Sequence, residues 1–252
     1  MNKRVKRLRV FAGPNGSGKS TLYNYLIQIN AYHTYYHINP DLIAKDLRVS
    51  LNLDNWPIDF SYTELGDFLK ASPFQSLVNF SMSDSLTYHE HKMSLKDPSL
   101  SNNTYLAAAI AHFLRIKMLQ SDSSFSFESV FSHVSKIQEL EDAKNANFKI
   151  YLYFISTSNP LINLQRVRNR VENGGHDVPG DKIHDRYLKT MNNLYQAFKL
   201  ADRAYFFDNS KEKINGSFDF FAEKNGNQLF LYDPDSVPQW FDKNILEPLV
   251  NK

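Results

Sequence analysis

Cysteine is absent from the 252-residue sequence, and so is any long apolar run. The first absence excludes disulfide bonds and thiol chemistry, and it fits a reducing compartment. The second excludes a membrane-spanning helix, which needs about 20 consecutive apolar residues. Basic residues near the N-terminus are not followed by an apolar segment, so no secretory signal is expected. The sequence therefore predicts a soluble cytoplasmic protein.

Net charge is also small, at +2, which is not typical of proteins that bind nucleic acids or membranes. One basic cluster, Lys3 to Arg9, alternates with apolar residues, and we interpret it as a solvated lead-in to a strand. We therefore expect neither a nucleic-acid partner nor a membrane partner. Hydrophobic residues make up 42% of the chain, which is enough for a packed core.

Apolar segments of strand length alternate with helical patterns, which is typical of a parallel sheet with crossover helices. We expect an α/β fold with a roughly five-stranded parallel sheet and helices on both faces. The expected strands are 7–12, 35–39, 124–128, 149–157 and 203–207. The expected helices are 19–29, 42–47, 105–120 with Thr104 as its cap, 135–145, 160–172 and 182–201.

Two segments are expected to elaborate a main domain of residues 1–210. An insertion without a strong period covers about 51–103, and a helical lid covers about 160–201. Residues 211–252 are expected to form an appendage. It would contain a β-hairpin that turns at Asn225-Gly226 and a short terminal helix near Trp240.

The segment from Gly13 to Ser20 matches the phosphate-loop pattern G-x-x-x-x-G-K-[ST] completely. Its glycines let backbone N–H groups point at phosphate oxygens, and the following helix adds its positive dipole end. Lys19 would neutralise the β- and γ-phosphates, and Ser20 would ligate Mg²⁺. A strand precedes the loop and a helix follows it, so nucleotide binding is favoured over a glycine-rich turn without a ligand. The residues expected to bind ATP or GTP are Gly13, Asn15, Gly16, Ser17, Gly18, Lys19, Ser20 and Thr21.

Further segments line up, in order, with one family. They are His37-Ile38-Asn39-Pro40-Asp41-Leu42-Ile43-Ala44, Phe127-Glu128-Ser129, the arginine-rich helix before Gly174-Gly175-His176, and Phe207-Asp208-Asn209-Ser210. With the phosphate loop, this set resembles the zeta-toxin family of P-loop kinases, in its branch with a Gly-Gly-His lid loop. The matches extend over about residues 7–210, with 51–103 unmatched.

The resemblance implies a five-stranded parallel sheet and ATP-dependent phosphotransfer. Zeta-type members phosphorylate the amino sugar of UDP-N-acetylglucosamine, and many are neutralised by a small antitoxin. We carry over the phosphotransfer, while for the Gly-Gly-His branch the acceptor is left open.

Asp41 follows the second expected strand, at the edge where open α/β sheets place ligands. A carboxylate there can accept the proton of an attacking hydroxyl, and the base implied by the resemblance falls on the same aspartate. The alternative is that Asp41 is the N-cap of the helix 42–47. Asp46 is the second candidate for the base.

Glu128 and Ser129 end the third expected strand, at the same kind of edge. Glu128 would hold a water bound to Mg²⁺ or orient the substrate, and Ser129 would hydrogen-bond to either. The alternative is a strand-end charge in solvent. Asp208-Asn209, after the fifth expected strand, is interpreted equally well as an adenine contact and as an Asx-turn.

The lid carries the remaining candidates. Arg166 and Arg170 are four residues apart on one helix face, while Arg168 points elsewhere. Arginines on a lid can close over the γ-phosphate and stabilise charge as it moves, and Arg186 on the returning helix would approach Arg170 near the tip. His176 follows two glycines in a movable turn, and we expect it to touch nucleotide or substrate rather than a metal.

These patterns and the resemblance predict a zeta-toxin-like kinase that moves the γ-phosphate of ATP to a hydroxyl of a small molecule. The acceptor that the resemblance suggests is a UDP-amino sugar. Lys19, Asp41 and the lid arginines would be catalytic. One alternative is a nucleoside or polynucleotide kinase. Another is a nucleotide-dependent ATPase switch or binding module that gates a partner. A small antitoxin is the protein partner that the resemblance implies.

Overall fold

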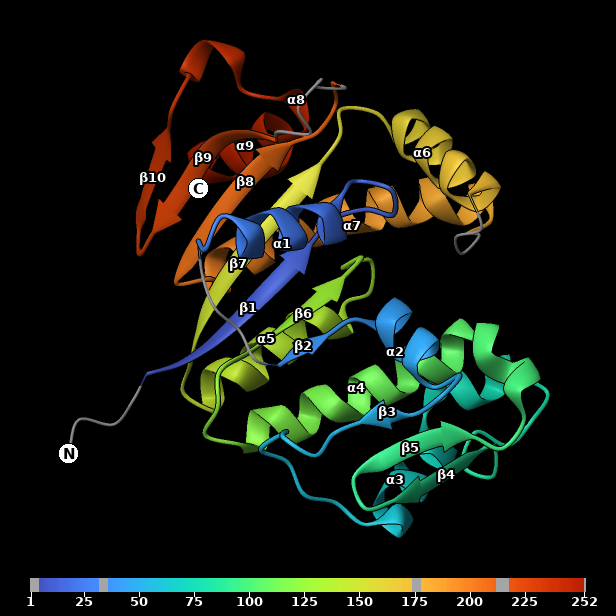
Figure 1. The fold of residues 1–252 in the computed structure, drawn as a ribbon. Coiled ribbons are helices and arrows are strands. Elements are labelled where there is room, and N and C mark those ends of the chain that lie inside the picture. The colour runs from blue at the N-terminus through green and yellow to red at the C-terminus, as the bar shows by residue number, and fades with distance from the viewer. Residues whose placement is uncertain (1–4, 32–35, 174–177, 212–217, 252) are drawn as a thin grey trace. The chain divides into compact units, whose positions relative to one another are not determined.

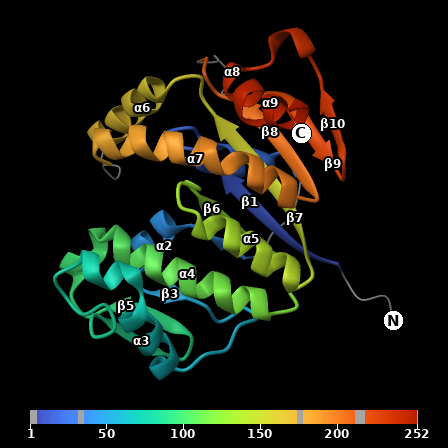
Figure 2. The same cartoon turned by 180° about the vertical axis from the view of Figure 1, so that it is seen from behind.

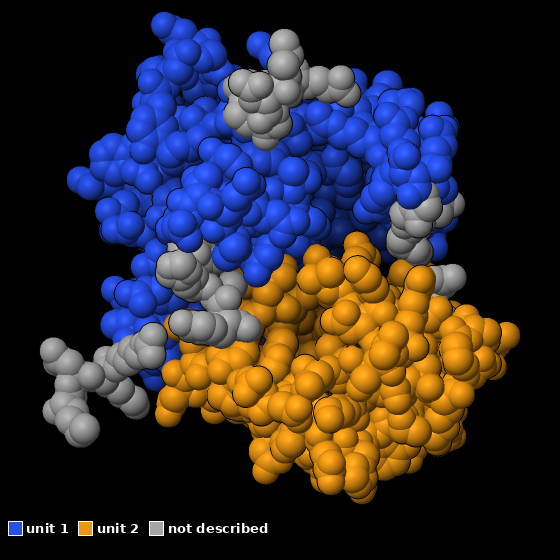
Figure 3. Space-filling model, in the orientation of Figure 1, with its two compact units in different colours: residues 1–34, 128–252 blue, residues 35–127 orange. Residues whose placement is uncertain are grey.

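The computed structural model describes residues 5–31, 36–173, 178–211 and 218–251. The chain divides into two compact units, which Figure 3 shows in different colours. The first unit consists of residues 1–34 and 128–252, and the second consists of residues 35–127. No helix in the described ranges is long and apolar enough to cross a membrane.

The first unit is built on strands in the order β10-β9-β8-β7-β1. Their bounds are β1 Lys6–Ala12, β7 Phe148–Ser156, β8 Arg203–Asp208, β9 Asp219–Asn225 and β10 Gln228–Leu231. β1, β7 and β8 are parallel, and β9 and β10 continue the sheet antiparallel. In the middle of the sheet Val10 pairs with Leu152, and Leu152 pairs with Ala204; all three side chains are fully buried. Both faces of β7 are covered, which explains why its sequence is almost continuously apolar.

Helices cover both faces of this sheet. The bounds are α1 Lys19–Gln28, α5 Ser135–Asn145, α6 Pro160–Glu172, α7 Gly180–Leu200, α8 Gln239–Phe241 and α9 Glu247–Val250, with a 3₁₀ turn at Pro234–Ser236 and a π-helical segment at Asp242–Leu246. Figure 1 shows α1 in front of β1 and β7, and Figure 2 shows α5 and α7 on the opposite face. The expectation of an α/β fold with a mostly parallel sheet and helices on both faces is confirmed.

The expected C-terminal hairpin is present, but its turn lies one residue further along the chain. Asn225 and Gln228 are paired, so the two turn residues are Gly226 and Asn227. Gly226 has φ +59°, and Asn227 is not among the described residues with positive φ. One positive φ at the first central position, occupied by glycine, is the requirement of a type II′ turn. The expected turn pair, Asn225-Gly226, is therefore displaced by one residue from the observed pair.

The second unit pairs β2 (His37–Ile38) with β6 (Phe125–Ser129), in parallel, and adds a small antiparallel sheet in the order β3-β5-β4. The remaining bounds are α2 Pro40–Asp46, β3 Leu51–Asn52, α3 Tyr62–Ala71, β4 Leu86–His89, β5 Lys92–Leu95 and α4 Thr104–Gln120, with 3₁₀ turns at Pro73–Leu77 and Pro98–Asn102. The boundary between the units falls within β6. The expected insertion 51–103 therefore contains strands and helices of its own.

The start of α4 differs by one residue from the expectation. The helix begins at Thr104, and the side chain of Asn103 accepts a hydrogen bond from the backbone N–H of Leu106 at 3.0 Å. Thr104 was therefore the wrong choice of cap. Both residue types cap helices well, and only the backbone conformation distinguishes their positions.

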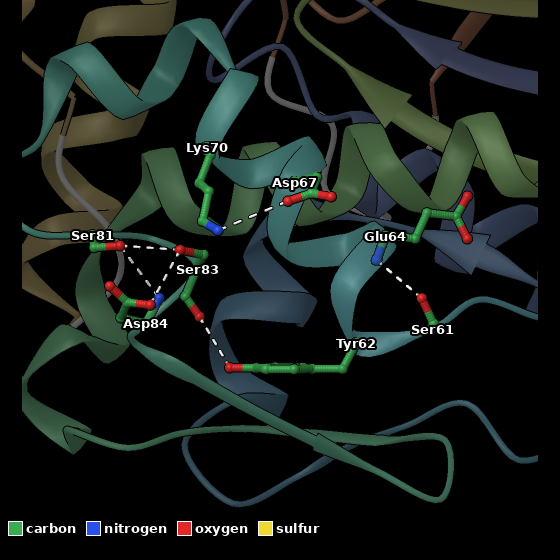
Figure 4. Close-up of polar contacts among 8 residues, drawn as sticks. All are labelled: Ser61, Tyr62, Glu64, Asp67, Lys70, Ser81, Ser83 and Asp84. Carbon is green, nitrogen blue, oxygen red and sulfur yellow. Dashed lines mark hydrogen bonds and ion pairs between the residues drawn. The ribbon is translucent and has the colours of Figure 1, made fainter.

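Around α3, side-chain hydrogen bonds fix a segment that has no regular period in sequence (Figure 4). Ser61 caps the helix by accepting from the N–H of Glu64 at 3.0 Å. The hydroxyl of Tyr62 donates to the carbonyls of Ser83 (3.3 Å) and Leu86 (3.0 Å). These bonds hold the turn before β4 against the first turn of α3.

A buried lysine fastens the end of α7 to β9. The ammonium of Lys224 donates to the carbonyls of Phe198 (2.5 Å), Lys199 (3.2 Å) and Ala201 (2.7 Å). The last carbonyls of a helix have no partner within the helix, and a cation there also interacts favourably with the helix dipole. Lys224 is only 7% exposed, so these carbonyls depend on it rather than on water.

We predict that Lys224→Met lowers the free energy of unfolding by about 1–3 kcal/mol, because buried carbonyls lose their donor. Denaturant titration measures the change. Lys149→Met is the matched control, since Lys149 is an exposed lysine on another strand of the same sheet and its loss should change little. Equal stability of the two variants would contradict a capping role for Lys224.

Lys224→Met should also remove a pH dependence of the free energy of unfolding. Burial lowers the pKa of Lys224 below its ordinary value of 10.5. Between the lowered pKa and the ordinary one, the unfolded chain holds the proton and the folded chain releases it, so wild-type stability gains as the pH increases through that window. Lys224→Met lacks this gain. The difference in unfolding free energy between wild type and variant should therefore grow with pH there, and a constant difference would contradict the assignment.

Candidate active site

The loop between β1 and α1 has a positive backbone φ at its three glycines, and at two of them the neighbouring backbone leaves no room for a Cβ atom. Gly13 has φ +149° and Gly16 has φ +74°. A Cβ atom on Gly13 would lie 2.0 Å from the carbonyl oxygen of Ile155, and one on Gly16 would lie 2.6 Å from the carbonyl oxygen of Asn163. Both distances are far inside van der Waals contact. These glycines are therefore required both by backbone conformation and by space.

The helix that follows the loop begins without a side-chain cap. Gly18 is the N-cap residue of α1, and no side chain among the described residues hydrogen-bonds there as a cap. The ammonium of Lys19 donates to the carbonyls of Gly13 (2.9 Å) and Pro14 (2.8 Å), so its charge lies over the loop. Uncapped N–H groups at a helix start, together with a cation, favour the binding of an anion.

Two oxygens of the loop are buried and have no hydrogen-bond partner in the described part of the chain. They are Oδ1 of Asn15 and Oγ of Ser17, and Ser17 as a whole is fully buried. Buried polar atoms are normally paired, so these two indicate that a ligand or water completes the loop.

Two predicted residues meet beside the loop. The hydroxyl of Ser20 donates to Oε2 of Glu128 at 2.6 Å, although the residues are 108 positions apart. Glu128 is 7% exposed at the end of β6, so the alternative of a strand-end charge in solvent is wrong. The structure thus brings together the hydroxyl and the carboxylate that were expected to act on Mg²⁺.

The donor set fits Mg²⁺. A hydroxyl and a carboxylate are the hard oxygen ligands that this ion prefers. The described residues contain no cluster of three or more histidine, aspartate or glutamate side chains that could hold a metal. Mg²⁺ suits such a sparse site, since it keeps several waters and takes phosphate oxygens as ligands.

Tyr23 is a neighbour of this site that the sequence did not suggest. It lies one turn after Ser20 on α1, and its ring contacts Phe11 edge-on at 5.2 Å between centroids. Burial, with a smaller contribution from the negative charge of Glu128, raises the pKa of Tyr23. The phenol therefore stays protonated at neutral pH. Its spacing from Ser20 on the same helix was the only signal in the sequence.

The hydroxyl of Ser129 is used locally. It accepts a hydrogen bond from the N–H of Phe131 at 3.0 Å. Phe131 has φ +63°, and a turn closed by a serine hydroxyl stabilises such a backbone. The role at the substrate that the sequence suggested for Ser129 stays a prediction.

The segment after β8 is occupied by structural contacts. The carboxylate of Asp208 accepts from the N–H of Ser210 (3.0 Å), from its hydroxyl (2.9 Å) and from the indole N–H of Trp240 (2.8 Å). The first of these bonds makes an Asx-turn, which was one of the two interpretations of this motif. Asn209 contacts the phosphate loop: its amide donates to the carbonyl of Ser17 at 2.9 Å.

A second asparagine, which the sequence reasoning missed, contacts the loop from the lid. The amide of Asn163, in the first turn of α6, donates to the carbonyl of Asn15 at 2.6 Å. Its own Oδ1 accepts from the hydroxyl of Thr157, and the side chain is fully buried. No local sequence pattern marks this residue, because its partners belong to other segments.

The segment expected to form a lid is a hairpin of α6 and α7, and its role as a lid stays a prediction. Val167 on α6 packs against Val178 and Ile183 in a small apolar cluster. With 3.6 residues per turn, Arg170 lies about 20° from the direction of Asn163 around α6, whereas Arg168 lies about 140° away. Because Asn163 contacts the phosphate loop, Arg170 is on the loop side of the helix.

The other lid candidates differ in exposure. Arg166 shares the loop-side face and is half-buried, Arg170 is exposed, and Arg186 is half-buried on α7. His176 lies outside the described residues. The catalytic and binding roles of these four side chains stay predictions.

Asp41 lies in the second unit, in the first turn of α2. The helix begins at Pro40, and the cap is Asn39, whose side chain accepts from the N–H of Asp41 at 2.9 Å. The alternative that Asp41 is the N-cap is therefore wrong. The helix starts two residues earlier than the sequence suggested because proline is well tolerated at the first helical position. The carboxylate of Asp41 is exposed.

No protein-family model matches the chain. An uncharacterised protein of Haemophilus influenzae is 38% identical over 63 residues, which is 25% of this chain and 45% of that protein. A chain in the crystal structure of the AvrRxo1-ORF1:AvrRxo1-ORF2 complex with sulphate ions superimposes with a TM-score of 0.53 at 15% identity, covering 93% of this chain and 65% of that one. The complex with ATP gives the same TM-score and identity, with 93% and 64% covered.

A chain of the PezAT toxin-antitoxin system of Streptococcus pneumoniae gives a TM-score of 0.48 at 13% identity, with 97% of this chain and 81% of that one covered. The protein described here spans less than two thirds of the length of the AvrRxo1 chains, and its match to the Haemophilus protein covers less than half of that protein. At these identities the structural likeness is one of fold. The phosphate loop between β1 and α1 and the parallel strands agree with it: the chain has an α/β P-loop fold of the kind seen in the AvrRxo1 complex.

Proposed function

We propose that the protein is an ATP-dependent phosphotransferase that moves the γ-phosphoryl group to a hydroxyl of a small molecule. The observation that carries the proposal is the contact of Ser20, the residue after Lys19, with the buried Glu128. Phosphoryl transfer needs mainly positioning and charge stabilisation, and these three groups can supply both at a phosphate loop. The likeness in fold to a protein crystallised with ATP supports ATP as the nucleotide.

Mg²⁺ is the metal that this donor set suits, with Ser20 and Glu128 as the residues that would hold it, directly or through water. When bound, it neutralises charge on the phosphates. The protein's own contribution is to add charge and to orient groups. Lys19 places a cation at the loop. Glu128, which is kept from solvent and bonded to Ser20, fixes the direction of the serine hydroxyl.

Asp41 is proposed as the base that accepts the proton of the acceptor hydroxyl. It follows the carboxyl end of β2, the kind of edge where open α/β sheets bind ligands. The capping role that competed with this assignment belongs to Asn39. The Asp41 carboxylate is therefore not used to start the helix.

Lid closure is proposed to act through the tip of the α6–α7 hairpin. Further along, α7 is bonded to the rest of the first unit. Tyr187 donates to the carbonyl of Thr157, and Thr190 donates to that of Val130, both at 2.7 Å. These bonds oppose a swing of the whole hairpin. Arg170, close to the tip, is the arginine that a local closure would bring over the γ-phosphate.

The acceptor that the family resemblance suggests is a UDP-amino sugar, and the partner that it suggests is a small antitoxin. The test below has two other outcomes. In the first, the acceptor is a nucleoside or a nucleic-acid end. In the second, the protein is a nucleotide switch and has no acceptor.

The direct test is incubation of the protein with γ-labelled ATP and a small-molecule extract of cells, followed by identification of the labelled product. We expect a phosphorylated small molecule. Lys19→Ala, prepared in parallel, should form none and should lose tight ATP binding by calorimetry, because its main countercharge is gone. A labelled nucleoside or nucleic acid would redirect the proposal. Slow release of phosphate with no labelled acceptor would favour a switch.

Asp41→Asn should separate binding from chemistry. The amide keeps the size of the side chain but cannot take up a proton, so ATP affinity should be unchanged while transfer to the acceptor falls by about two to four powers of ten. Calorimetry and steady-state transfer measure the two effects. Asp46→Asn, at the other end of α2, is the comparison variant. If only the Asp46 variant is slow, the base is Asp46.

Arg170→Ala should lower kcat by orders of magnitude with little effect on ATP affinity, because an arginine used only on closure stabilises the transition state more than bound ATP. Arg168→Ala is the matched control on the same helix and should be nearly silent. Normal turnover in the Arg170 variant would remove the hairpin tip from the mechanism. Equal losses in both variants would show that the face of α6 is assigned wrongly.

A further inference from the structure

Two asparagine amides hold the phosphate loop by its carbonyl oxygens. Asn163 donates to the carbonyl of Asn15, and Asn209 donates to the carbonyl of Ser17. The donors come from different elements, the first turn of α6 and the segment after β8. Neither asparagine belongs to the sequence motif that defines the loop.

The amide of Asn163 has one favourable orientation. Its oxygen accepts from the hydroxyl of Thr157, so its nitrogen faces the carbonyl of Asn15. The side chain is fully buried, so water does not replace either partner. A buried amide with both ends bonded is a rigid donor.

The held carbonyls determine where the next N–H groups point. A trans peptide is planar, so its C=O and the following N–H point in opposite directions. With the carbonyl of Asn15 turned toward Asn163, the N–H of Gly16 points away from Asn163. With the carbonyl of Ser17 turned toward Asn209, the N–H of Gly18 points away from Asn209.

The loop has no space to move toward either asparagine. A Cβ on Gly16 would lie 2.6 Å from the backbone oxygen of Asn163, and a Cβ on Gly18 would lie 2.7 Å from Nδ2 of Asn209. The loop therefore rests directly against both residues at its glycines. Hydrogen bonding and close packing restrict the same two peptides.

We propose that Asn163 and Asn209 are positioning residues for phosphate: they hold the Asn15–Gly16 and Ser17–Gly18 peptides so that the N–H groups of Gly16 and Gly18 face the bound anion. The proposal rests on nucleotide binding at this loop, and it adds a coupling. Because Asn163 is part of α6, the base of the lid and the phosphate-binding backbone are held by one side chain. A shift of the lid base changes the loop, and an anion in the loop holds the lid base.

The test uses inorganic pyrophosphate, which contacts the loop without a base or a ribose. Asn163→Asp and Asn209→Asp keep the side-chain size but replace the donor with an acceptor. We expect each to bind pyrophosphate and ATP about ten- to a hundredfold more weakly by calorimetry, because a buried carbonyl loses its donor and its peptide is free to turn. Asn169→Asp is the matched control: it lies on α6, is exposed, and contacts Gln165 rather than the loop.

A second measurement uses the wild-type protein, so it does not require the aspartate variants to fold. In the wild-type protein, pyrophosphate should slow hydrogen exchange at the N–H groups of Gly16 and Gly18. Unchanged exchange at both, in protein that binds pyrophosphate, would overturn the proposal. So would folded aspartate variants that melt earlier yet keep full pyrophosphate affinity, since that result shows a structural role only. Wild-type protein that binds neither pyrophosphate nor ATP would overturn the proposed function as well.

Discussion

The glycines of the phosphate loop have no side chains that could hold the backbone in place, and the arrangement of the first unit follows from that constraint. Gly13 and Gly16 leave no room for a Cβ, so neighbouring strands and helices approach to contact distance. β7 supplies the Ile155 carbonyl on one side because it pairs with β1 residue by residue. On the other sides of the loop, α6 supplies the amide of Asn163 and the segment after β8 supplies the amide of Asn209. Neighbouring elements therefore hold the loop together with Lys19, whose ammonium donates to the carbonyls of Gly13 and Pro14.

The sequence was a sufficient guide where chemistry is encoded locally. Ser20 is marked by the loop motif and Glu128 by the end of a buried strand, and parallel topology then brings the two side chains to 2.6 Å. The sequence was an insufficient guide where two nearby residues are equally suited to cap a helix. Asn39 rather than Asp41 caps α2, and Asn103 rather than Thr104 caps α4. Such choices depend on backbone angles that composition does not reveal.

Long-range contacts were beyond the reach of the sequence for a different reason. Asn163 and Asn209 lie 148 and 192 positions from their loop partners. An isolated asparagine near a helix start is ordinary, and Asn159, a few residues earlier, caps the same helix α6. Nothing in the residue type separates Asn159 from Asn163 until the fold places one of them against the loop.

The bond between Trp240 and Asp208 gives the protein an internal optical reporter. The chain has two tryptophans, and the other, Trp56, belongs to the second unit. The indole of Trp240 is buried and bonded to the residue next to Asn209, whose amide holds the loop. Indole emission responds to the polarity and hydrogen bonding around the ring. A rearrangement of the loop that moves Asn209 is thus transmitted through one peptide to a natural fluorophore, without any label being attached.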